Sequence, residues 1–206
     1  MNDQLKKHWE DVYHTKSPYE VSWTEPKPER SLKLIHNTQA PKNSPIIDIG
    51  GGDSLLVDYL LDEGYSDITV LDISAKAIER AKNRLGEKAA KITWLVSDIL
   101  HFEPEKQYSV WHDRATFHFL TTVDRKSKYR YLVENAVADG HLIMGTFSLS
   151  GPGQCSGLAV CQYDISALAD VFKGSFEVKS HFYADHLTPF QTSQNFLFAD
   201  FIKVNN

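Results

Sequence analysis

The sequence predicts a doubly wound α/β fold, in which helices cover both faces of a mostly parallel sheet. The first observation behind this prediction is that short β-branched, apolar runs alternate with helical patterns. The second is that a glycine-rich turn follows the first run, and the third is that the first three runs each reach an aspartate near their end. Alternating strands and helices are typical of right-handed βαβ units, which build parallel sheets.

Each expected element has its own sequence signals. The first strand lies between Pro45 and a glycine turn, Gly64 is a stop signal for the helix after it, and Ser74 is an N-cap for the next helix. Strands are expected at Ile46–Ile49, Ile68–Leu71, Ile92–Val96, Ser109–His112 and His141–Phe147. Helices are expected at Asp3–His14, Glu29–Asn37, Ser54–Glu63, Ala75–Leu85, Lys126–Val137 and Asp164–Phe172. Two further runs with no helix between them, Phe176–Tyr183 and Asn195–Lys203, predict a terminal β-hairpin with a long connection.

The turn after the first strand has the composition of a ligand-binding loop. Its glycines allow the backbone to turn sharply and to approach a ligand closely, and the helix start behind it favours a negatively charged ligand group. A dinucleotide fingerprint is excluded because Leu55 takes the place of its third glycine, and a P-loop is excluded because no Gly-Lys-Ser/Thr follows. The spacing that remains is Asp48-x-Gly50-x-Gly52.

Acids also end the second and third strands, at Asp72 and Asp98. In doubly wound folds, an acid at the tip of the second strand accepts hydrogen bonds from ribose hydroxyls. The alternative for Asp72 is that it merely precedes the N-cap Ser74. Three successive strands that end in an acid at a similar point favour a nucleotide-type site.

The chain resembles the class I (seven-β-strand) S-adenosylmethionine-dependent methyltransferases over nearly its whole length. The matching motifs are Asp48–Gly52, Leu71–Ser74, Ser97–Ile99, His112–Arg114 and Gly140–Ile143. The resemblance implies a Rossmann-like, seven-stranded sheet with one antiparallel strand near the C-terminus, and S-adenosyl-L-methionine as the cofactor. Carried over by position, the implied cofactor-binding residues are Asp48, Gly50, Gly51, Gly52, Asp72, Ile73, Asp98 and Ile99.

The resemblance further implies one methyltransferase domain over residues 1–206, with residues 1–44 as a helical lid and residues 45–206 as the cofactor-binding core. In this family the N-terminal extension folds over the cofactor, and a sulfonium cation is attracted to aromatic faces. Tyr13 and Trp23 are therefore candidates for contact with the cofactor or substrate. The alternative is that the N-terminal aromatic residues, Trp9 above all, only pack against the domain.

Candidate catalytic residues follow the fourth strand, which flanks the topological switch point of the predicted sheet. His112, Asp113 and His118 are the tight cluster of potential proton acceptors there. The alternative is that His112 caps a backbone group and that Asp113 pairs with Arg114. No metal is expected, because no third ligand stands at a suitable spacing. A long glycine-rich loop at residues 146–158 is expected to have no secondary structure of its own and to shape the substrate side. Nothing in the sequence supports Cys155 as a nucleophile.

Composition limits the partners. The 22 basic and 27 acidic residues give a net charge of −5, and without a basic block nucleic-acid binding is disfavoured. No apolar run reaches the roughly 18 residues of a membrane span, and the first residues lack the apolar core of a signal peptide. With only two cysteines, a reduced, cytoplasmic protein is expected. The sequence leaves the oligomeric state open.

The acceptor is the least constrained part of the prediction. The run from Asp113 to His118 is similar to the Asp-Lys-Gly-Thr-x-Asp run of lysine methyltransferases that act on elongation factors and citrate synthase, but it ends in histidine instead of an acid. The Asn-Pro-Pro-Tyr signature of amino-directed DNA and glutamine methyltransferases is absent. We expect in-line methyl transfer to a small molecule; the alternatives are a protein lysine and, less favoured, cofactor binding without catalysis.

Overall fold

The computed structural model describes residues 3–204, so the terminal residues 1–2 and 205–206 of the predicted domain lie outside the described residues. It contains the predicted Rossmann-like sheet of seven strands, in the order β3-β2-β1-β4-β5-β9-β8. Of these seven strands, β9 runs in the direction opposite to the other six, which confirms the expected single antiparallel strand. The strands are β1 Ile46–Ile49, β2 Ile68–Asp72, β3 Ile92–Val96, β4 Val110–Arg114, β5 His141–Phe147, β8 Phe176–Leu187 and β9 Ser193–Lys203.

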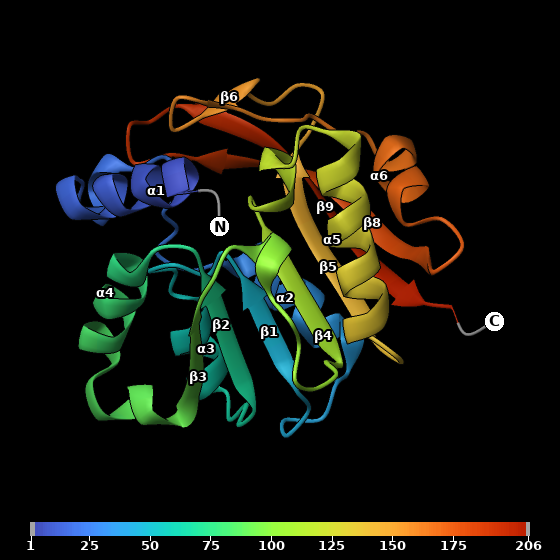
Figure 1. The fold of residues 1–206 in the computed structure, drawn as a ribbon, viewed down its shortest axis with the longest axis horizontal. Coiled ribbons are helices and arrows are strands. Elements are labelled where there is room, and N and C mark those ends of the chain that lie inside the picture. The colour runs from blue at the N-terminus through green and yellow to red at the C-terminus, as the bar shows by residue number, and fades with distance from the viewer. Residues whose placement is uncertain (1–2, 205–206) are drawn as a thin grey trace.

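Helices cover both faces of the sheet, and α1 lies across the end where the parallel strands finish (Figure 1). On one face α2 and α3 pack on the central strands, and on the other face α5 and α6 do so. The α-helices are α1 Asp3–Thr15, α2 Glu29–Thr38, α3 Leu56–Asp62, α4 Ala75–Leu85, α5 Val123–Ala136 and α6 Ile165–Phe172. The 3-10 helices are η1 Pro18–Glu20, η2 Gly86–Lys91, η3 Ile99–His101 and η4 Phe117–Phe119.

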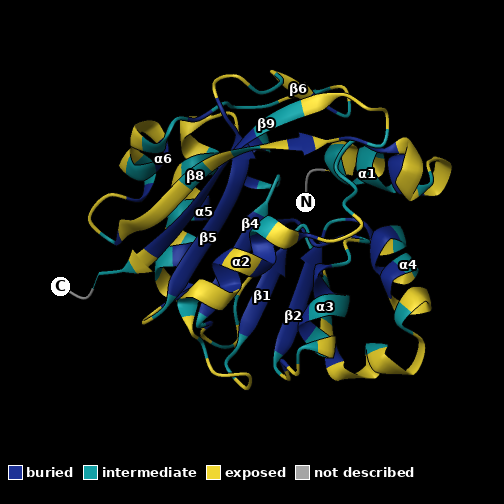
Figure 2. Cartoon of the chain, turned by 180° about the vertical axis from the view of Figure 1, so that it is seen from behind, coloured by how far each residue is buried: buried dark blue, intermediate teal, exposed yellow. Residues whose placement is uncertain are grey.

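The core is divided by the alternation of side chains along each strand. Ile46 and Val110 face α2 and α3, whereas Ile47 and Trp111 face α5 and α6. All four residues of β1 are buried, as is typical of a central parallel strand with helices on both sides (Figure 2). Each large apolar side chain buried in this way contributes roughly 1.5–3 kcal/mol. This alternation also determines which residues of β4 reach the site described below.

Two expectations about the C-terminal half are wrong. The connection between β8 and β9 is short, residues 188–192, because both strands extend beyond their predicted ends. The side chain of Thr188 closes the turn by accepting a hydrogen bond from Thr192 N. The glycine-rich loop also contains structure of its own, the hairpin of β6 Gln154–Cys155 and β7 Leu158–Ala159. Its turn residues Ser156 and Gly157 both have positive φ, as the tight turns that favour hairpins require.

Candidate active site

A cavity of about 460 Å³ lies at the carboxyl ends of β1 to β4, beneath α1 and the segment that follows it. This is the position at which ligands bind in open α/β sheets. Most of the residues predicted to bind the cofactor line it: Asp48, Gly50, Gly51, Asp72, Ile73, Asp98, Ile99, Tyr13 and Trp23. His112 lines it as well. The fold therefore brings together motifs that are widely separated in the sequence.

The glycine loop requires glycine for two reasons. Gly50 and Gly52 have φ values of +65° and +52°, which other residues adopt only at a cost. A Cβ at Gly50 would also lie 1.9 Å from Thr116 Oγ1, and one at Gly52 would lie 2.7 Å from the Tyr13 hydroxyl. Gly52, which is not among the cavity-lining residues of the described chain, thus allows α1 to approach the loop closely.

The acids of the second and third strands lie at the cavity as predicted. Asp72 is 5% exposed, and burial, together with the charges of Asp53 and Asp48, raises its pKa to about 7. Its Oδ1 accepts a hydrogen bond from Ser74 N at 2.7 Å, and the side chain of Ser74 in turn caps α4. Asp72 therefore supports the start of the helix and also lines the cavity. Asp98 is also buried and caps η3 by accepting from Leu100 N.

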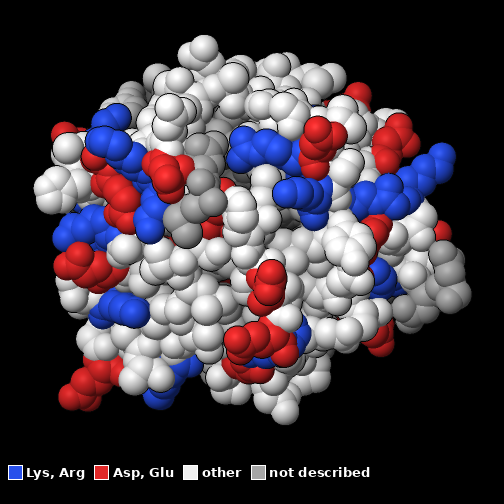
Figure 3. Space-filling view, viewed as in Figure 1, with Lys and Arg blue, Asp and Glu red and all other residues white. Residues whose placement is uncertain are grey.

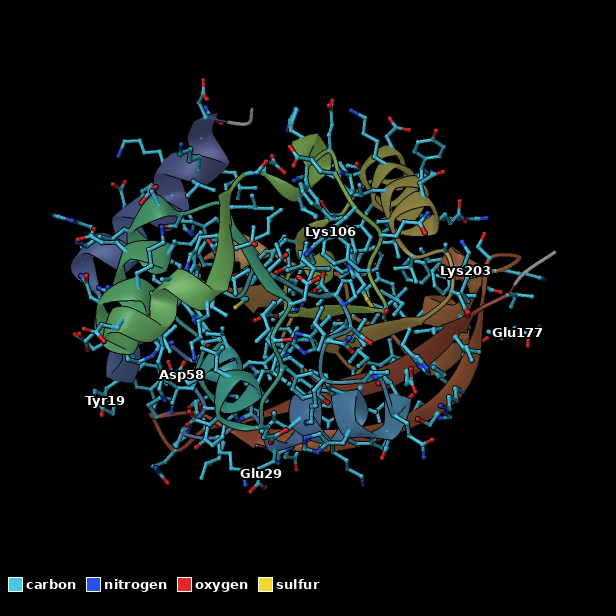
Figure 4. All side chains as sticks on the ribbon, turned by 90° about the horizontal axis from the view of Figure 1, so that it is seen from below. Tyr19, Glu29, Asp58, Lys106, Glu177 and Lys203 are labelled. Atoms are coloured by element: carbon cyan, nitrogen blue, oxygen red, sulfur yellow. The ribbon has the colours of Figure 1, made fainter. Side chains whose placement is uncertain are left out.

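Aromatic side chains form the roof of the cavity. The ring centroid of Trp23 lies 5.7 Å from that of Trp9 and 6.2 Å from that of Tyr13, and Phe119 packs on Trp9 at 5.3 Å. Tyr13 is buried, whereas Tyr19, which also contributes to the cavity lining, is 80% exposed and lies at the periphery of the molecule (Figure 4). The N-terminal aromatic residues therefore pack together and also line the cavity, and their contact with cofactor or substrate stays a prediction.

Glu10 fastens α1 to the cofactor side of the cavity. Its carboxylate accepts hydrogen bonds from the backbone N–H groups of Ala75 and Lys76, at 2.7 and 3.1 Å, and from the Ser74 hydroxyl. These donors are the free N–H groups at the start of α4, where a negative charge is favourable. The position of α1 is thus linked to the segment that carries Asp72.

A second anchor, which the sequence did not predict, holds residues 22–25 of the roof. The side chain of Glu25 is 7% exposed, and its Oε1 lies 3.3 Å from both Arg114 Nη2 and His186 Nδ1 and 3.5 Å from Arg30 Nη1. Burial alone would raise the pKa of Glu25, but the interactions with His186, Arg114 and Arg30 hold it below its ordinary value. Arg114 and His186 also donate to the Trp23 and Ser22 carbonyls, at 3.0 and 2.6 Å.

His112 bridges two other residues of the cavity wall. It pairs with Asp48 across β1 and β4, and its Nδ1 lies 2.7 Å from Asp48 Oδ1. Its Nε2 lies 2.8 Å from the hydroxyl of Ser31 on α2. All three residues are buried and line the cavity. The sequence drew attention to His112 and Asp48 but not to Ser31, because a serine in the first turn of a helix is indistinguishable from an ordinary helix-start residue.

Asp113 is directed away from the cavity, because successive residues of a strand point to opposite faces. It lies beneath α5, where it accepts hydrogen bonds from the Tyr129 hydroxyl at 2.6 Å and from Thr116 N and Phe117 N at 3.0 Å. Burial raises its pKa to about 6. Asp113 therefore organises the turn after β4, and the alternative that it pairs with Arg114 is wrong because Arg114 pairs with Glu25.

His118 is also outside the cavity lining within residues 3–204. Its ring is fully buried, 4.7 Å from the Phe147 ring between centroids, and no described residue forms a hydrogen bond with either ring nitrogen. Burial, and secondarily the charge of Arg114, lowers its pKa to about 3. A ring of such low basicity accepts few protons near neutral pH, which disfavours the predicted acid–base role.

The other reactive groups and the surface add little to the site. Burial raises the pKa of Cys155 to about 11, so this cavity-lining thiol stays protonated at neutral pH.

Within residues 3–204 no group of three His, Cys, Asp or Glu side chains is arranged to hold a metal ion. Over the same residues, no helix is long and apolar enough to cross a membrane. Acidic and basic side chains are interspersed on the face shown in Figure 3.

Comparisons with known proteins relate the fold to named relatives. Residues 46–137 match the family model described as a methyltransferase domain. The chain is 34% identical to a malonyl-[acyl-carrier protein] O-methyltransferase of Anoxybacillus flavithermus, over 56% of this chain and 41% of that protein. It is 26% identical to the EEF1A lysine methyltransferase 2 of Danio rerio, over 77% of this chain and 66% of that protein. The chain thus spans well under two thirds of the first relative and just under two thirds of the second.

A solved SAM-dependent methyltransferase from Anabaena variabilis has the same fold. The match has a TM-score of 0.75 and covers 98% of this chain and 94% of the other, at 17% sequence identity. The matched family model and the shared fold both agree with the resemblance carried by the sequence motifs. Residues 46–137 are thus similar to a methyltransferase domain, and the chain has the fold of the solved methyltransferase from Anabaena variabilis.

Proposed function

We propose that this chain binds S-adenosyl-L-methionine in the roofed cavity and catalyses methyl transfer to a small-molecule acceptor. The observation that carries the proposal is the convergence of the glycine loop, Asp72 and Asp98 on that one cavity. When bound, the cofactor supplies a methyl group on a cationic sulfur, which keeps the electron pair of the broken C–S bond. The protein then contributes mainly alignment of the acceptor with the methyl group, an effect worth up to roughly 7–11 kcal/mol.

The residues present fit the parts of the cofactor. Asp72 is buried at the cavity with a pKa raised to about 7, so hydroxyl donors from a ribose would stabilise its charged form. Asp98, with Ile73 and Ile99 beside it, offers one polar acceptor and two apolar surfaces for the adenine ring. The aromatic roof would face the sulfonium, which aromatic rings attract.

Cavity size limits the part of the acceptor that can enter the site. Pockets that enclose drug-sized ligands measure about 300–1,000 Å³. At about 460 Å³ the cavity is near the lower end of that range, and the cofactor would take up a large part of it. The Glu25 anchor holds the roof over the remaining space, which limits the acceptor to a small molecule or to one side chain of a larger one.

A protein lysine is the second candidate, supported by the Asp113–His118 run and by the relative from Danio rerio that is named as a lysine methyltransferase. The relative from Anoxybacillus flavithermus is named for a malonyl group on a carrier protein, so the named relatives differ in their acceptors. Non-catalytic cofactor binding is least supported, because the cavity extends beyond the cofactor residues to His112, Arg114 and Cys155.

One experiment tests the function and the acceptor class together. The protein is first titrated with S-adenosylhomocysteine by calorimetry, and then incubated with methyl-labelled S-adenosylmethionine and host lysate, whose products are separated by size. We expect binding and label in the low-mass fraction. Label on a discrete protein band would reverse the choice of acceptor. Binding of S-adenosylhomocysteine without label in either fraction would favour the non-catalytic alternative. No binding of S-adenosylhomocysteine would refute the proposed cofactor site.

A further inference from the structure

We propose that Ser31, His112 and Asp48 form a proton relay beside the acceptor, and that the acceptor atom is consequently a nitrogen or oxygen that still carries a proton when it binds. This inference rests on the proposed methyl transfer. It extends that proposal by specifying the chemistry of the acceptor and by assigning a role to Ser31.

The relay is continuous and preorganised. Asp48 and His112 are register partners on adjacent parallel strands, and α2 covers the same face of the sheet with Ser31. The two links measure 2.7 Å, from Asp48 Oδ1 to His112 Nδ1, and 2.8 Å, from His112 Nε2 to Ser31 Oγ. The three residues are 4%, 3% and 1% exposed, respectively, so water competes little for these hydrogen bonds.

The partners determine the direction of the hydrogen bonds. An ionised Asp48 only accepts, so His112 donates to it through Nδ1–H. The lone pair on Nε2 then accepts the Ser31 hydroxyl proton, which leaves the lone pairs of Ser31 Oγ available for a donor in the cavity. This is the arrangement in which a carboxylate orients an imidazole and the imidazole activates a hydroxyl group.

Charges on the surrounding elements bear on the imidazole. Asp48 on β1 is hydrogen-bonded to the ring, and Asp113, the next residue on β4, lies on the other face of the sheet. Arg114 on β4 pairs with Glu25 from the roof, which also meets Arg30 at the start of α2. The residue opposite His112 on β5 is the apolar Ile143. The nearest charge to the ring is thus the negative charge of Asp48.

Proton transfer through the relay is balanced. As the acceptor forms its bond to the methyl group, its N–H or O–H proton passes to Ser31 Oγ, and the electron pair of that bond stays on the acceptor atom. The original hydroxyl proton of Ser31 passes to His112 Nε2, and Asp48 stabilises the resulting imidazolium. The proton later leaves to solvent. An amine or hydroxyl acceptor needs this path, whereas a carboxylate, a thioether or a tertiary amine has no proton to lose.

The test compares Ser31→Ala and His112→Gln with the wild type in label transfer to host lysate. We expect each variant to lose about 10²–10⁴-fold in rate, the typical contribution of acid–base catalysis, while the affinity for S-adenosylhomocysteine stays within a few-fold. Ser31→Thr, which keeps the hydroxyl, should recover most of the rate. The rates of the impaired variants should rise with pH, because an acceptor that deprotonates in solution no longer needs the relay.

His141→Gln is the matched control. His141 forms an equally short bond with a buried carboxylate, 2.7 Å from Nδ1 to Asp200 Oδ1, and is not a cavity-lining residue within the described chain. Its rate per folded molecule should equal that of the wild type. Full activity of Ser31→Ala, or a loss that is the same at every pH, would overturn the relay.

A second measurement decides the relay even if no label is transferred. In protein with ¹⁵N-labelled histidine, NMR reports which ring nitrogen of His112 carries the proton, with the resonance assigned through His112→Gln. We expect a neutral ring protonated at Nδ1 whose Nε2 resonance shifts in Ser31→Ala. A neutral ring protonated at Nε2 would refute the relay. Wild-type protein that binds S-adenosylhomocysteine but transfers no label would instead count against the proposed function.

Discussion

Replacing Asp72 by asparagine should stabilise the protein without cofactor and weaken cofactor binding. The pKa of Asp72 is raised from 3.8 to about 7, chiefly because burial penalises the charged carboxylate. The difference of about three pKa units corresponds to an upper limit of roughly 4 kcal/mol at about 1.4 kcal/mol per unit. Asparagine keeps an oxygen to accept the hydrogen bond from Ser74 N but carries no charge. We therefore expect Asp72→Asn to be more stable by about 1–3 kcal/mol at pH 8.

The pH dependence of stability has a definite sign. Between about pH 4 and pH 7 the folded protein holds a proton on Asp72 that the unfolded chain has released, so the free energy of unfolding falls as the pH rises through this window. The variant should show a shallower fall over the same window. Urea unfolding at pH 5 and pH 8 measures both slopes. Equal slopes, or a variant less stable than the wild type at pH 8, would refute the assignment of this buried charge.

Cofactor binding should show the opposite effect of pH. Ribose hydroxyls donate to an ionised Asp72, so binding of S-adenosylhomocysteine should release a proton near pH 7 and tighten as the pH rises. Calorimetry in buffers of different ionisation enthalpy counts that proton. For Asp72→Asn we expect no such release and an affinity about 10–100-fold lower, since two charge-assisted hydrogen bonds become neutral ones. An unchanged proton count would show that Asp72 does not contact the ligand.

Three further substitutions test other parts of the site. Gly50→Ala should cost about 1–3 kcal/mol of stability in urea unfolding, because φ is +65° and Thr116 Oγ1 lies 1.9 Å from the new Cβ. At Gly153 the new Cβ would meet no atom of the described chain within 4 Å beyond its chain neighbours, so Gly153→Ala should stay within about 0.5 kcal/mol. Glu10→Ala should weaken S-adenosylhomocysteine binding about tenfold by releasing α1 from α4, whereas Asp11→Ala, on the exposed side of the same helix, should leave binding unchanged. Equal affinities of the two variants in calorimetry would refute the role of α1 as a lid. Tyr129→Phe should lower the free energy of unfolding by about 1–3 kcal/mol, because it removes the hydrogen-bond partner of Asp113 and Trp111, and it should leave cofactor affinity unchanged. A loss of affinity would indicate that Asp113 contributes to the binding site.

The sequence predicted the sheet, and it predicted that the glycine loop and the acids meet at one edge of it, because these signals are local. The glycines after β1 and the acids after β2 and β3 each follow a strand whose length and composition are visible in the sequence. The boundaries of α4 Ala75–Leu85 and β3 Ile92–Val96 agree with the prediction for the same reason. Parallel strands then bring these signals to one edge of the sheet without further information.

The acceptor side was less predictable because long-range contacts and strand alternation build it. Glu25 meets His186 and Arg114 from segments far apart in the chain, and no spacing marks these residues as partners. The sequence indicates Asp113 and His118 only through their proximity to the switch point, which does not show the direction of a side chain. The strand period of two directs Asp113 beneath α5 and leaves His112 at the cavity.

If the proposed relay operates, consecutive residues of strand β4 contribute to chemistry, to the position of the roof and to stability. His112 and Arg114 lie on the cavity side, where one meets Ser31 and Asp48 and the other holds the roof through Glu25. Asp113, between them, holds the following turn against α5 from the opposite face. A shift of β4 by one residue against β1 would exchange these faces, placing the carboxylate of Asp113 in the cavity and the imidazole in the core. The register Asp48↔His112 is thus the structural feature on which the proposed relay depends most directly.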